Sequence, residues 1–258
     1  MKNRTLNLLA LLIIMSATTM AQTQFSIERY VTQTGDTLLY RQLEPQKIDA
    51  NTEYPLVLFL HGAGERGNDN EAQLLHGAYM FTNPVNRDKY PAFALFPQCP
   101  TDSFWAPINR SGTKSETFFP YDANITPSLQ VVKELVDKFI ENYPVDRNRI
   151  YIMGISMGGM GTFDMVCRYP DLFAAAIPIC GGVNPNRLNE IETSTAFKIF
   201  HGDADPVVPV EFSREAYTIL KAKDINVAYM EFPGVDHNSW TPAFNSPHFM
   251  DWIFSQSK

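Results

Sequence analysis

Short apolar runs alternate with polar, glycine- and proline-rich segments along most of this chain. A continuous apolar run of about four to eight residues, bounded by such segments, is typical of a strand buried on both faces of a parallel sheet. Residues 25–31 and 37–43 instead alternate between apolar and polar positions on either side of a turn, which predicts a hairpin. The continuous runs predict six further strands, at residues 54–60, 92–96, 150–153, 173–179, 196–200 and 226–232.

Helical patterns separate these strands. The best marked follows Thr126, which can cap a helix, and Pro127, which suits its first position; Tyr143 and Pro144 end it. Further helices are expected at about residues 70–80, 157–168, 186–191, 210–223 and 247–255, with a long aromatic loop at residues 101–125. The alternation predicts an α/β fold, in which a mostly parallel central sheet of about eight strands carries an N-terminal antiparallel hairpin and helices on both faces.

The first 21 residues differ from the rest of the chain. Lys2 and Arg4 precede an apolar stretch, and small residues precede Gln22, as in a cleaved secretory signal peptide. The apolar stretch is short for a membrane span, and no cysteine lies near the cleavage site to carry a lipid. We therefore expect a secreted or periplasmic protein without stable membrane association after cleavage, with a single catalytic domain at residues 22–258.

The composition narrows the function classes. A chain of 258 residues, 45% of them hydrophobic, suits one globular domain with a substantial core. The net charge of -7 and the lack of a basic run argue against a nucleic-acid partner. Cys99, Cys167 and Cys180 form no CxxC or His/Cys cluster, so no metal or other cofactor is expected. They also fall in different predicted elements, and we expect no structural disulfide.

Gly154, Ser156 and Gly158 fit the pattern G-x-S-x-G between a predicted strand and a predicted helix. That context is what a nucleophile elbow requires, because the sharp turn lifts the serine hydroxyl above the sheet edge. The pattern by itself is short enough to occur by chance. Its flanking elements, and the residues that the rest of the chain brings to the same edge, make Ser156 the predicted nucleophile.

A serine nucleophile needs a base and an acid. Among five histidines, His237 alone follows the last predicted strand, in a loop that can reach across the sheet edge. Asp203 and Asp205 compete as the acid in the loop after the preceding strand; we favour Asp205 and expect Asp203 to brace the turn. Asp236 adjoins His237 and is a poor partner for its ring. The order Ser156, Asp205, His237 is that of α/β-hydrolases.

The other histidines have structural expectations. His61 and His201 each end a predicted strand before a glycine, and we expect them to form local hydrogen bonds that shape their loops. His76 and His248 fall in predicted helices, where packing or surface exposure is expected.

Acyl transfer also needs donors for an oxyanion. The backbone amide of Met157 lies at the start of the elbow helix and is the first candidate. The second donor is expected in the glycine-rich loop after the third strand, where we favour the Ala63 amide, with that of Gly64 as the alternative.

Five segments together resemble a known family, namely residues 58–68, 96–100, 154–159, 201–209 and 234–240. They are similar to the phospholipase/carboxylesterase-like branch of the α/β-hydrolases. Within it they resemble secreted bacterial esterases often labelled predicted peptidases, which are similar to feruloyl and acetyl-xylan esterases and polyhydroxybutyrate depolymerases. The resemblance runs from about residue 55 to the C-terminus. It implies the α/β-hydrolase fold, a Ser156–His237–Asp205 triad, and oxyanion donors at Met157 and near Ala63.

Two tryptophans and one charged pair near these motifs have open roles. Trp105 in the long loop and Trp240 beyond His237 can line a substrate cleft by stacking on sugars or phenolic rings, and packing is the alternative for each. Glu65 and Arg66 can bind a polar substrate group, but we favour an ion pair between them.

We therefore predict a secreted serine carboxylesterase that hydrolyses feruloyl- or acetyl-type esters of plant polysaccharide, with a small-molecule or polysaccharide ester as its substrate. Alternative enzymatic hypotheses are a serine peptidase and a lipid or polyester esterase of the same fold. The alternative from another class is a non-catalytic carbohydrate-binding protein. The oligomeric state is not predicted.

Overall fold

The apolar runs form one sheet in the computed structural model, which describes residues 24–258. Its eight strands lie in the order β1-β2-β4-β3-β5-β6-β7-β8. Their bounds are Ser26–Val31 (β1), Thr37–Leu43 (β2), Tyr54–Leu60 (β3), Phe93–Pro97 (β4), Val145–Ile155 (β5), Ala175–Ile179 (β6), Ala196–Gly202 (β7) and Val227–Phe232 (β8).

The hairpin β1–β2 is antiparallel and joins the sheet through an antiparallel pairing of β2 with β4. All remaining neighbours are parallel. The predicted fold class is thereby confirmed. Every residue of β3 is buried, as its continuous apolar sequence indicates.

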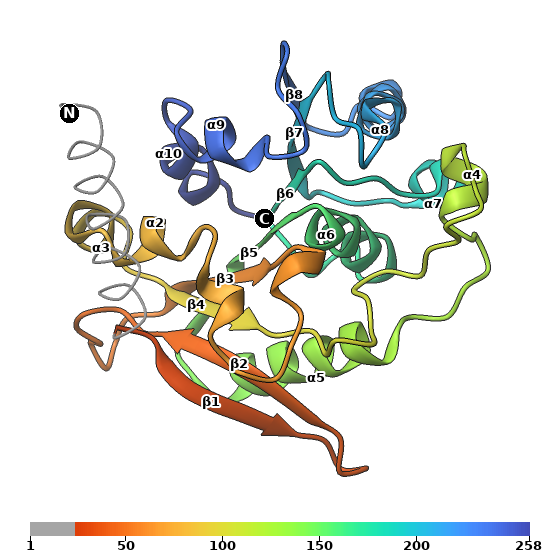
Figure 1. Ribbon diagram of the computed structural model, residues 1–258. Helices are drawn as coiled ribbons and strands as arrows, with labels where there is room; N and C mark the ends of the chain where they lie inside the picture. The colour runs from red at the N-terminus through yellow and green to blue at the C-terminus, as the bar shows by residue number, and fades with distance from the viewer. Residues whose placement is uncertain (1–23) are drawn as a thin grey trace, which may run out of the picture.

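The helices join these strands and cover both faces of the sheet (Figure 1). Their bounds are Ala63–Glu65 (η1) and Ala72–Leu74 (η2), which are 3-10 turns, and Ala78–Thr82 (α2), Pro84–Lys89 (α3), Ser115–Phe118 (α4), Pro127–Asn142 (α5), Met157–Arg168 (α6), Pro185–Glu190 (α7), Val210–Ala222 (α8), Trp240–Phe244 (α9) and Phe249–Phe254 (α10).

Two hydrophobic clusters lie on opposite faces of the sheet. One packs α5, α6 and α8 against strand residues such as Leu58, and the other packs α2, α9 and α10 against strand residues such as Val57. Because neighbouring strand residues point to opposite faces, Val57 and Leu58 belong to different clusters. The layers are visible in Figure 1, with α5 and α6 on one side and α2, α9 and α10 on the other.

Some predicted helices differ from those in the structure. The helix expected at residues 70–80 is split into η2 and α2, because Gly77 takes a left-handed conformation with φ 81°. A Cβ there would lie 2.5 Å from the Phe59 ring, so this break depends on packing against the sheet. The aromatic loop contains the short helix α4, and α9 precedes the final helix. The capped helix after Thr126 begins and ends as predicted: the Thr126 hydroxyl accepts a hydrogen bond from the Leu129 amide at 3.2 Å.

Three loops follow the carboxyl ends of parallel strands and carry the predicted chemistry: those after β3, β7 and β8. Ser156 follows β5 at the same edge. Within residues 24–258, no helix is both long and apolar enough to cross a membrane. The predicted signal peptide at residues 1–21 lies outside the described residues.

Candidate active site

Ser156 stands at a strained turn between β5 and α6, with φ 53° and ψ -117°. Non-glycine residues avoid positive φ, and it persists only where the surrounding structure enforces it. The turn also needs glycine on both sides. A Cβ on Gly158 would lie 1.9 Å from the carbonyl oxygen of Leu60, and one on Gly154 would lie 2.3 Å from that of Gly158. The G-x-S-x-G spacing therefore results from close backbone contacts between β5, α6 and the end of β3.

Three predicted side chains meet above this turn. The Ser156 hydroxyl lies 2.8 Å from Nε2 of His237, which is in the loop after β8. The other ring nitrogen, Nδ1, lies 2.7 Å from Oδ2 of Asp205, in the loop after β7. A serine, an imidazole and a carboxylate in this order can move a proton from the hydroxyl to the ring and stabilise the charged ring.

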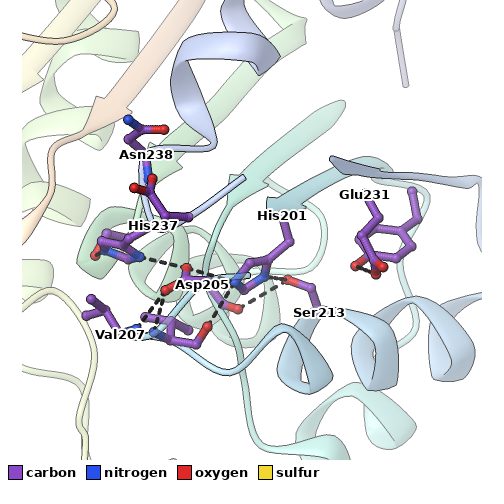
Figure 2. A network of polar contacts seen from close by, with 12 residues as sticks. His201, Asp205, Val207, Ser213, Glu231, His237 and Asn238 are labelled. Carbon is purple, nitrogen blue, oxygen red and sulfur yellow. Dashed lines mark hydrogen bonds and ion pairs between the residues drawn. The ribbon is translucent and has the colours of Figure 1, made fainter. Parts of the chain in front are cut away.

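The Asp205 carboxylate has hydrogen-bond donors at both oxygens, and its side chain is fully buried. Oδ1 accepts from the amides of Val207 at 2.8 Å and Val208 at 3.0 Å. Oδ2 contacts His237 and also Nε2 of His201, at 3.1 Å (Figure 2). Burial by itself raises the pKa of Asp205, but the hydrogen bonds from His201, His237 and the two amides outweigh it and hold the pKa well below its usual range. The group is therefore a carboxylate at neutral pH.

The two competing acids lie elsewhere. Oδ1 of Asp203 accepts a hydrogen bond from the Gly234 amide at 2.6 Å, which ties the loop after β7 to the loop that carries His237. Oδ1 of Asp236 accepts a hydrogen bond from the backbone amide two residues later in the chain. The structure thus places Asp205, and neither alternative, against the His237 ring, and it gives Asp203 the expected bracing contact.

His61 shapes its own loop, as predicted: Nδ1 lies 2.6 Å from the Gly62 carbonyl, and Nε2 accepts from the Cys99 amide at 2.9 Å. For His201 the prediction was incomplete. This ring does contact its own loop, at the Val208 carbonyl, but it also touches the predicted acid. The available signal was its position four residues ahead of Asp205.

His76 and His248 lie within the ranges predicted as helices, but neither residue is helical in the structure. His76 is in the bend before α2, and His248 takes a left-handed conformation at the residue that precedes α10.

The two predicted oxyanion donors each stand at the start of a helical segment. Met157 is the first residue of α6, and Ala63 is the first residue of η1. The amides in the first turn of a helix have no partner within that helix and are free to bind an anion. The loop before η1 packs on the elbow strand, since a Cβ on Gly62 would stand 3.7 Å from the Ile155 carbonyl oxygen. Ala63 and Gly64 both remain candidates for the second donor.

Trp105 does not line a cleft, so its predicted role in substrate binding is wrong. Its side chain is fully buried, and its ring nitrogen donates to the His61 carbonyl at 3.1 Å. Trp105 packs so closely on α6 that a Cβ added to Gly161 would lie 2.6 Å from the Cβ of Trp105. The alternative, packing, is the correct one: the aromatic loop folds this residue into the core beneath the loop after β3.

Trp240 has a different environment. It is partly exposed, and its ring stands edge-on to His237, with 5.6 Å between centroids and an interplanar angle of 87°. On the other side it lies 5.2 Å from the His76 ring. The Trp240 and His76 rings therefore form an aromatic pair beside the predicted base.

The predicted ion pair between Glu65 and Arg66 is not formed. Arg66 donates from Nε to the Ala63 carbonyl at 3.0 Å, and its guanidinium lies 4.7 Å from the Phe104 ring centroid. Glu65 points the other way, with Oε1 3.7 Å from Nε2 of His76. The 3-10 turn η1 separates the two side chains. Their adjacency in the sequence does not reveal this separation.

All three cysteines are free thiols. Within the described part of the chain, one group of potential metal ligands comes together, formed by Cys180, Asp205 and His237 within 4.8 Å of one another. Two of its members are already hydrogen-bonded to each other. Burial raises the pKa of the Cys180 thiol to about 12, and a protonated thiol is a poor metal ligand. The donor set therefore suits a proton relay better than a metal.

Comparisons with known proteins show similarity to esterases in sequence and in fold. A model of the phospholipase/carboxylesterase family matches residues 47–247. The poly(3-hydroxyalkanoate) depolymerase C of Paucimonas lemoignei is 29% identical over 177 residues, which are 67% of this chain and 37% of that protein. The bifunctional acetylxylan esterase/xylanase XynS20E of Neocallimastix patriciarum is 29% identical over 108 residues, 42% of this chain and 16% of that protein.

The chain thus spans well under half the length of these two curated relatives. Among solved structures, a thermostable esterase superposes with a TM-score of 0.79 at 36% sequence identity, covering 92% of this chain and 64% of that one.

Proposed function

Because the chain belongs to the phospholipase/carboxylesterase family, and is thus an esterase of the α/β-hydrolase fold, we propose that it works as a serine carboxylesterase through an acyl-enzyme on Ser156. The observation that carries this proposal is the row of two short hydrogen bonds, 2.8 Å from Ser156 to His237 and 2.7 Å from His237 to Asp205. The row begins at a strained turn whose only polar side chain is the serine.

In the acylation step, Oγ of Ser156 attacks the ester carbonyl carbon while Nε2 of His237 takes the hydroxyl proton. The Asp205 carboxylate stabilises the resulting imidazolium, for which its ionised state is required. The carbonyl oxygen becomes an oxyanion that accepts hydrogen bonds from the amides of Met157 and Ala63. Collapse of this intermediate breaks the ester bond, and His237 returns the proton to the departing alcohol.

In the deacylation step, water replaces the alcohol. His237 takes a proton from the water as it attacks the acyl carbon, and the same two amides hold the second oxyanion. When the bond to Oγ breaks, the carboxylic acid leaves and the proton returns to Ser156. The base and both oxyanion donors thus act in both steps.

For the substrate, we favour acetyl- or feruloyl-type esters of plant polysaccharide. By its name, the acetylxylan esterase/xylanase relative acts on one such substrate, acetylxylan. Trp240 is partly exposed and lies beside His237, and its aromatic ring is suited to contact with a sugar or a phenolic ring.

An aliphatic polyester is the second candidate. The depolymerase relative supports it. Two apolar side chains flank the site in sequence and remain largely exposed: Leu75, which precedes His76, at 56%, and Val207, two residues after Asp205, at 64%. Exposed apolar side chains suit contact with a hydrophobic polymer surface.

We also propose that the protein is exported by cleavage before Gln22, on the sequence evidence for a signal peptide. Expression of the full chain in a bacterial host, followed by mass spectrometry of the periplasmic and medium fractions, tests this. A mature N-terminus at Gln22 is expected, and an uncleaved chain confined to the cytoplasm would contradict it.

The test of the mechanism is Ser156→Ala, with Ser111→Ala, an exposed serine of the aromatic loop, as matched control. We expect Ser156→Ala to lower kcat on p-nitrophenyl acetate by about 10⁴-fold or more, and to abolish labelling by a fluorophosphonate probe. The control should keep both. Turnover at the wild-type rate in Ser156→Ala would contradict the proposal.

A substrate panel then decides between the candidates. It compares methyl ferulate, acetylated xylan, dispersed polyhydroxybutyrate and matched peptide anilides. Preference for the polyester would replace the polysaccharide assignment, and preference for the anilide would make the protein a peptidase.

A further inference from the structure

A second histidine, His201, contacts the predicted acid from the side opposite His237. It is in β7, its side chain is fully buried, and its Nε2 lies 3.1 Å from Oδ2 of Asp205 and 3.1 Å from the Val208 carbonyl oxygen. Its Nδ1 lies 2.7 Å from the hydroxyl of Ser213, on α8. Figure 2 shows the ring between Asp205 and Ser213.

The contacts of this ring determine where its proton lies. Nε2 of His201 faces two acceptors, a carboxylate and a carbonyl, and it must therefore carry a hydrogen to satisfy either. The Ser213 hydroxyl can donate to Nδ1 at 2.7 Å or to the Gly181 carbonyl at 3.3 Å. Because Nε2 carries the hydrogen, the N–H of the ring is directed at Asp205, and Nδ1 faces the Ser213 hydroxyl.

We infer that His201 is a positioning residue, which fixes the Asp205 carboxylate so that Oδ2 faces His237. This inference rests on the proposed serine mechanism. The two amides at Oδ1 hold one end of the carboxylate, and the two imidazoles share the other end. Without His201, Oδ2 keeps one N–H partner in a fully buried setting, and the carboxylate can rotate or tilt to find another donor.

His201 cannot act by touching substrate, because its side chain has no exposed surface. The neighbouring acid Glu231, its partner across β7 and β8, is engaged elsewhere, by Arg214 at 2.7 Å and by Tyr229 at 2.6 Å. The ring therefore acts on the reaction through Asp205 and His237. A small displacement of the base from Ser156 costs up to about 10²-fold in rate, while the binding of the ester is unchanged.

The test compares three variants on p-nitrophenyl acetate. His201→Leu removes the donor and fills the space, His201→Gln returns an amide N–H at about the position of Nε2, and Ser213→Ala removes the partner of Nδ1. Thr218→Ala, which deletes an exposed hydroxyl from the same helix α8, is the matched control.

We expect His201→Leu to lower kcat about 10–100-fold with KM within twofold of wild type, and His201→Gln to recover most of that loss. Ser213→Ala should lower kcat several-fold, and Thr218→Ala should match wild type. A general loss of structure would reduce the active fraction in proportion to unfolding, so kcat is corrected for the folded fraction measured by circular dichroism.

Wild-type kcat in folded His201→Leu would overturn the inference, as would equal losses in the Leu and Gln variants. If His201→Leu does not fold, Ser213→Ala decides: unchanged kcat in this variant overturns the inference, whereas a fall in kcat at constant KM supports it. Failure of the serine mechanism is distinguished by Ser156→Ala, which would then remain active whatever the His201 variants do.

Discussion

The Asp205 carboxylate and the loop after β3, on two sides of Ser156, differ in how completely their polar atoms are paired. On the acid side, the side chains of Asp205 and His201 are fully buried, and the four donor contacts of the carboxylate measure 2.7, 2.8, 3.0 and 3.1 Å. The second histidine completes this network from the far side. Such a saturated buried network holds one geometry, which proton transfer requires.

On the oxyanion side, the loop after β3 is less constrained. Within residues 24–258, Oε2 of Glu65 is a buried acceptor without a hydrogen-bond partner, and Oε1 lies 3.7 Å from His76. A Cβ on Gly64 would have no atom within 4 Å. The comparison indicates a rigid proton-transfer side and an ester-binding side with room to adjust. Changes to the first should act on kcat, and changes around the second, outside the donors themselves, on KM.

The largest effect is expected at Asp205. Asp205→Asn removes the charge that stabilises the His237 imidazolium and presents an amide to the ring, so we expect kcat to fall by about 10⁴-fold. Asp203→Asn is the matched control, since its contact with the Gly234 amide needs only an acceptor oxygen; it should retain activity within about threefold. Steady-state kinetics on p-nitrophenyl acetate measures both, and equal losses would mean that the acid was misassigned.

The difference in stability between wild type and Asp205→Asn should also depend on pH. The folded-state pKa of Asp205 is depressed below the unfolded value of about 3.9. Its stabilising contribution is therefore complete above that value and is lost as the pH falls through the folded-state pKa. Denaturant unfolding should show the stability gap between wild type and Asp205→Asn narrowing as the pH is lowered from 5 to about 2. A gap that widens on acidification would contradict this.

The sequence predicts this acid side almost completely. The strand-to-helix context of Ser156, and the positions of Asp205 and His237 after the last two parallel strands, follow from apolar patterns and from the topology they imply. His201 was assigned only a local role, because its contact with Asp205 depends on the path of the loop between them, which no periodicity encodes.

Predictions failed on the other side for a physical reason. The burial of Trp105 and the separation of Glu65 from Arg66 both depend on tertiary packing around the loop after β3. The break at Gly77 depends on the Phe59 ring. Local sequence reports propensity, and these features are decided by neighbours that are distant in the chain.

The next largest effect is expected at the second oxyanion donor. Ala63→Pro removes the amide hydrogen, and the backbone accepts proline here because Ala63 starts η1 and Gly62 is extended, with φ -77° and ψ 177°. We expect kcat to fall about 10²–10³-fold. Ala63→Gly keeps the amide and should stay near wild type. A fully active Ala63→Pro enzyme would move the donor to Gly64.

The two tryptophans separate substrate contact from packing. Trp240→Ala should raise KM for aryl esters about threefold to tenfold, since an aromatic contact contributes about 0.5–1.5 kcal/mol, with stability little changed. Trp105→Ala should leave KM of the folded enzyme unchanged and destabilise it by about 3–5 kcal/mol, as for a buried tryptophan. Kinetics and denaturant unfolding of both variants test this, and the reverse pattern would restore Trp105 to the cleft.

The smallest effect is expected at His76 and Glu65, on the side where the polar atoms are incompletely paired. Burial lowers the pKa of His76, and the nearby Glu65 carboxylate partly opposes this. Glu65→Gln removes the opposing charge, so the His76 titration, followed by NMR, should move to lower pH. Since the unfolded chain then binds more protons than the folded one below about pH 6.5, stability should fall more steeply on acidification than in wild type.

Glu71→Gln, which alters an exposed carboxylate of the same loop, is the control and should leave the His76 titration in place. If Glu65→Gln moves the titration upward, the carboxylate does not face His76 in solution. Incomplete pairing would then not be the only difference between the loop after β3 and the acid side, because this loop would also place its carboxylate elsewhere. A shift in the expected direction, with kcat unchanged, would support the view that this side contributes to binding and leaves proton transfer to the network around Asp205.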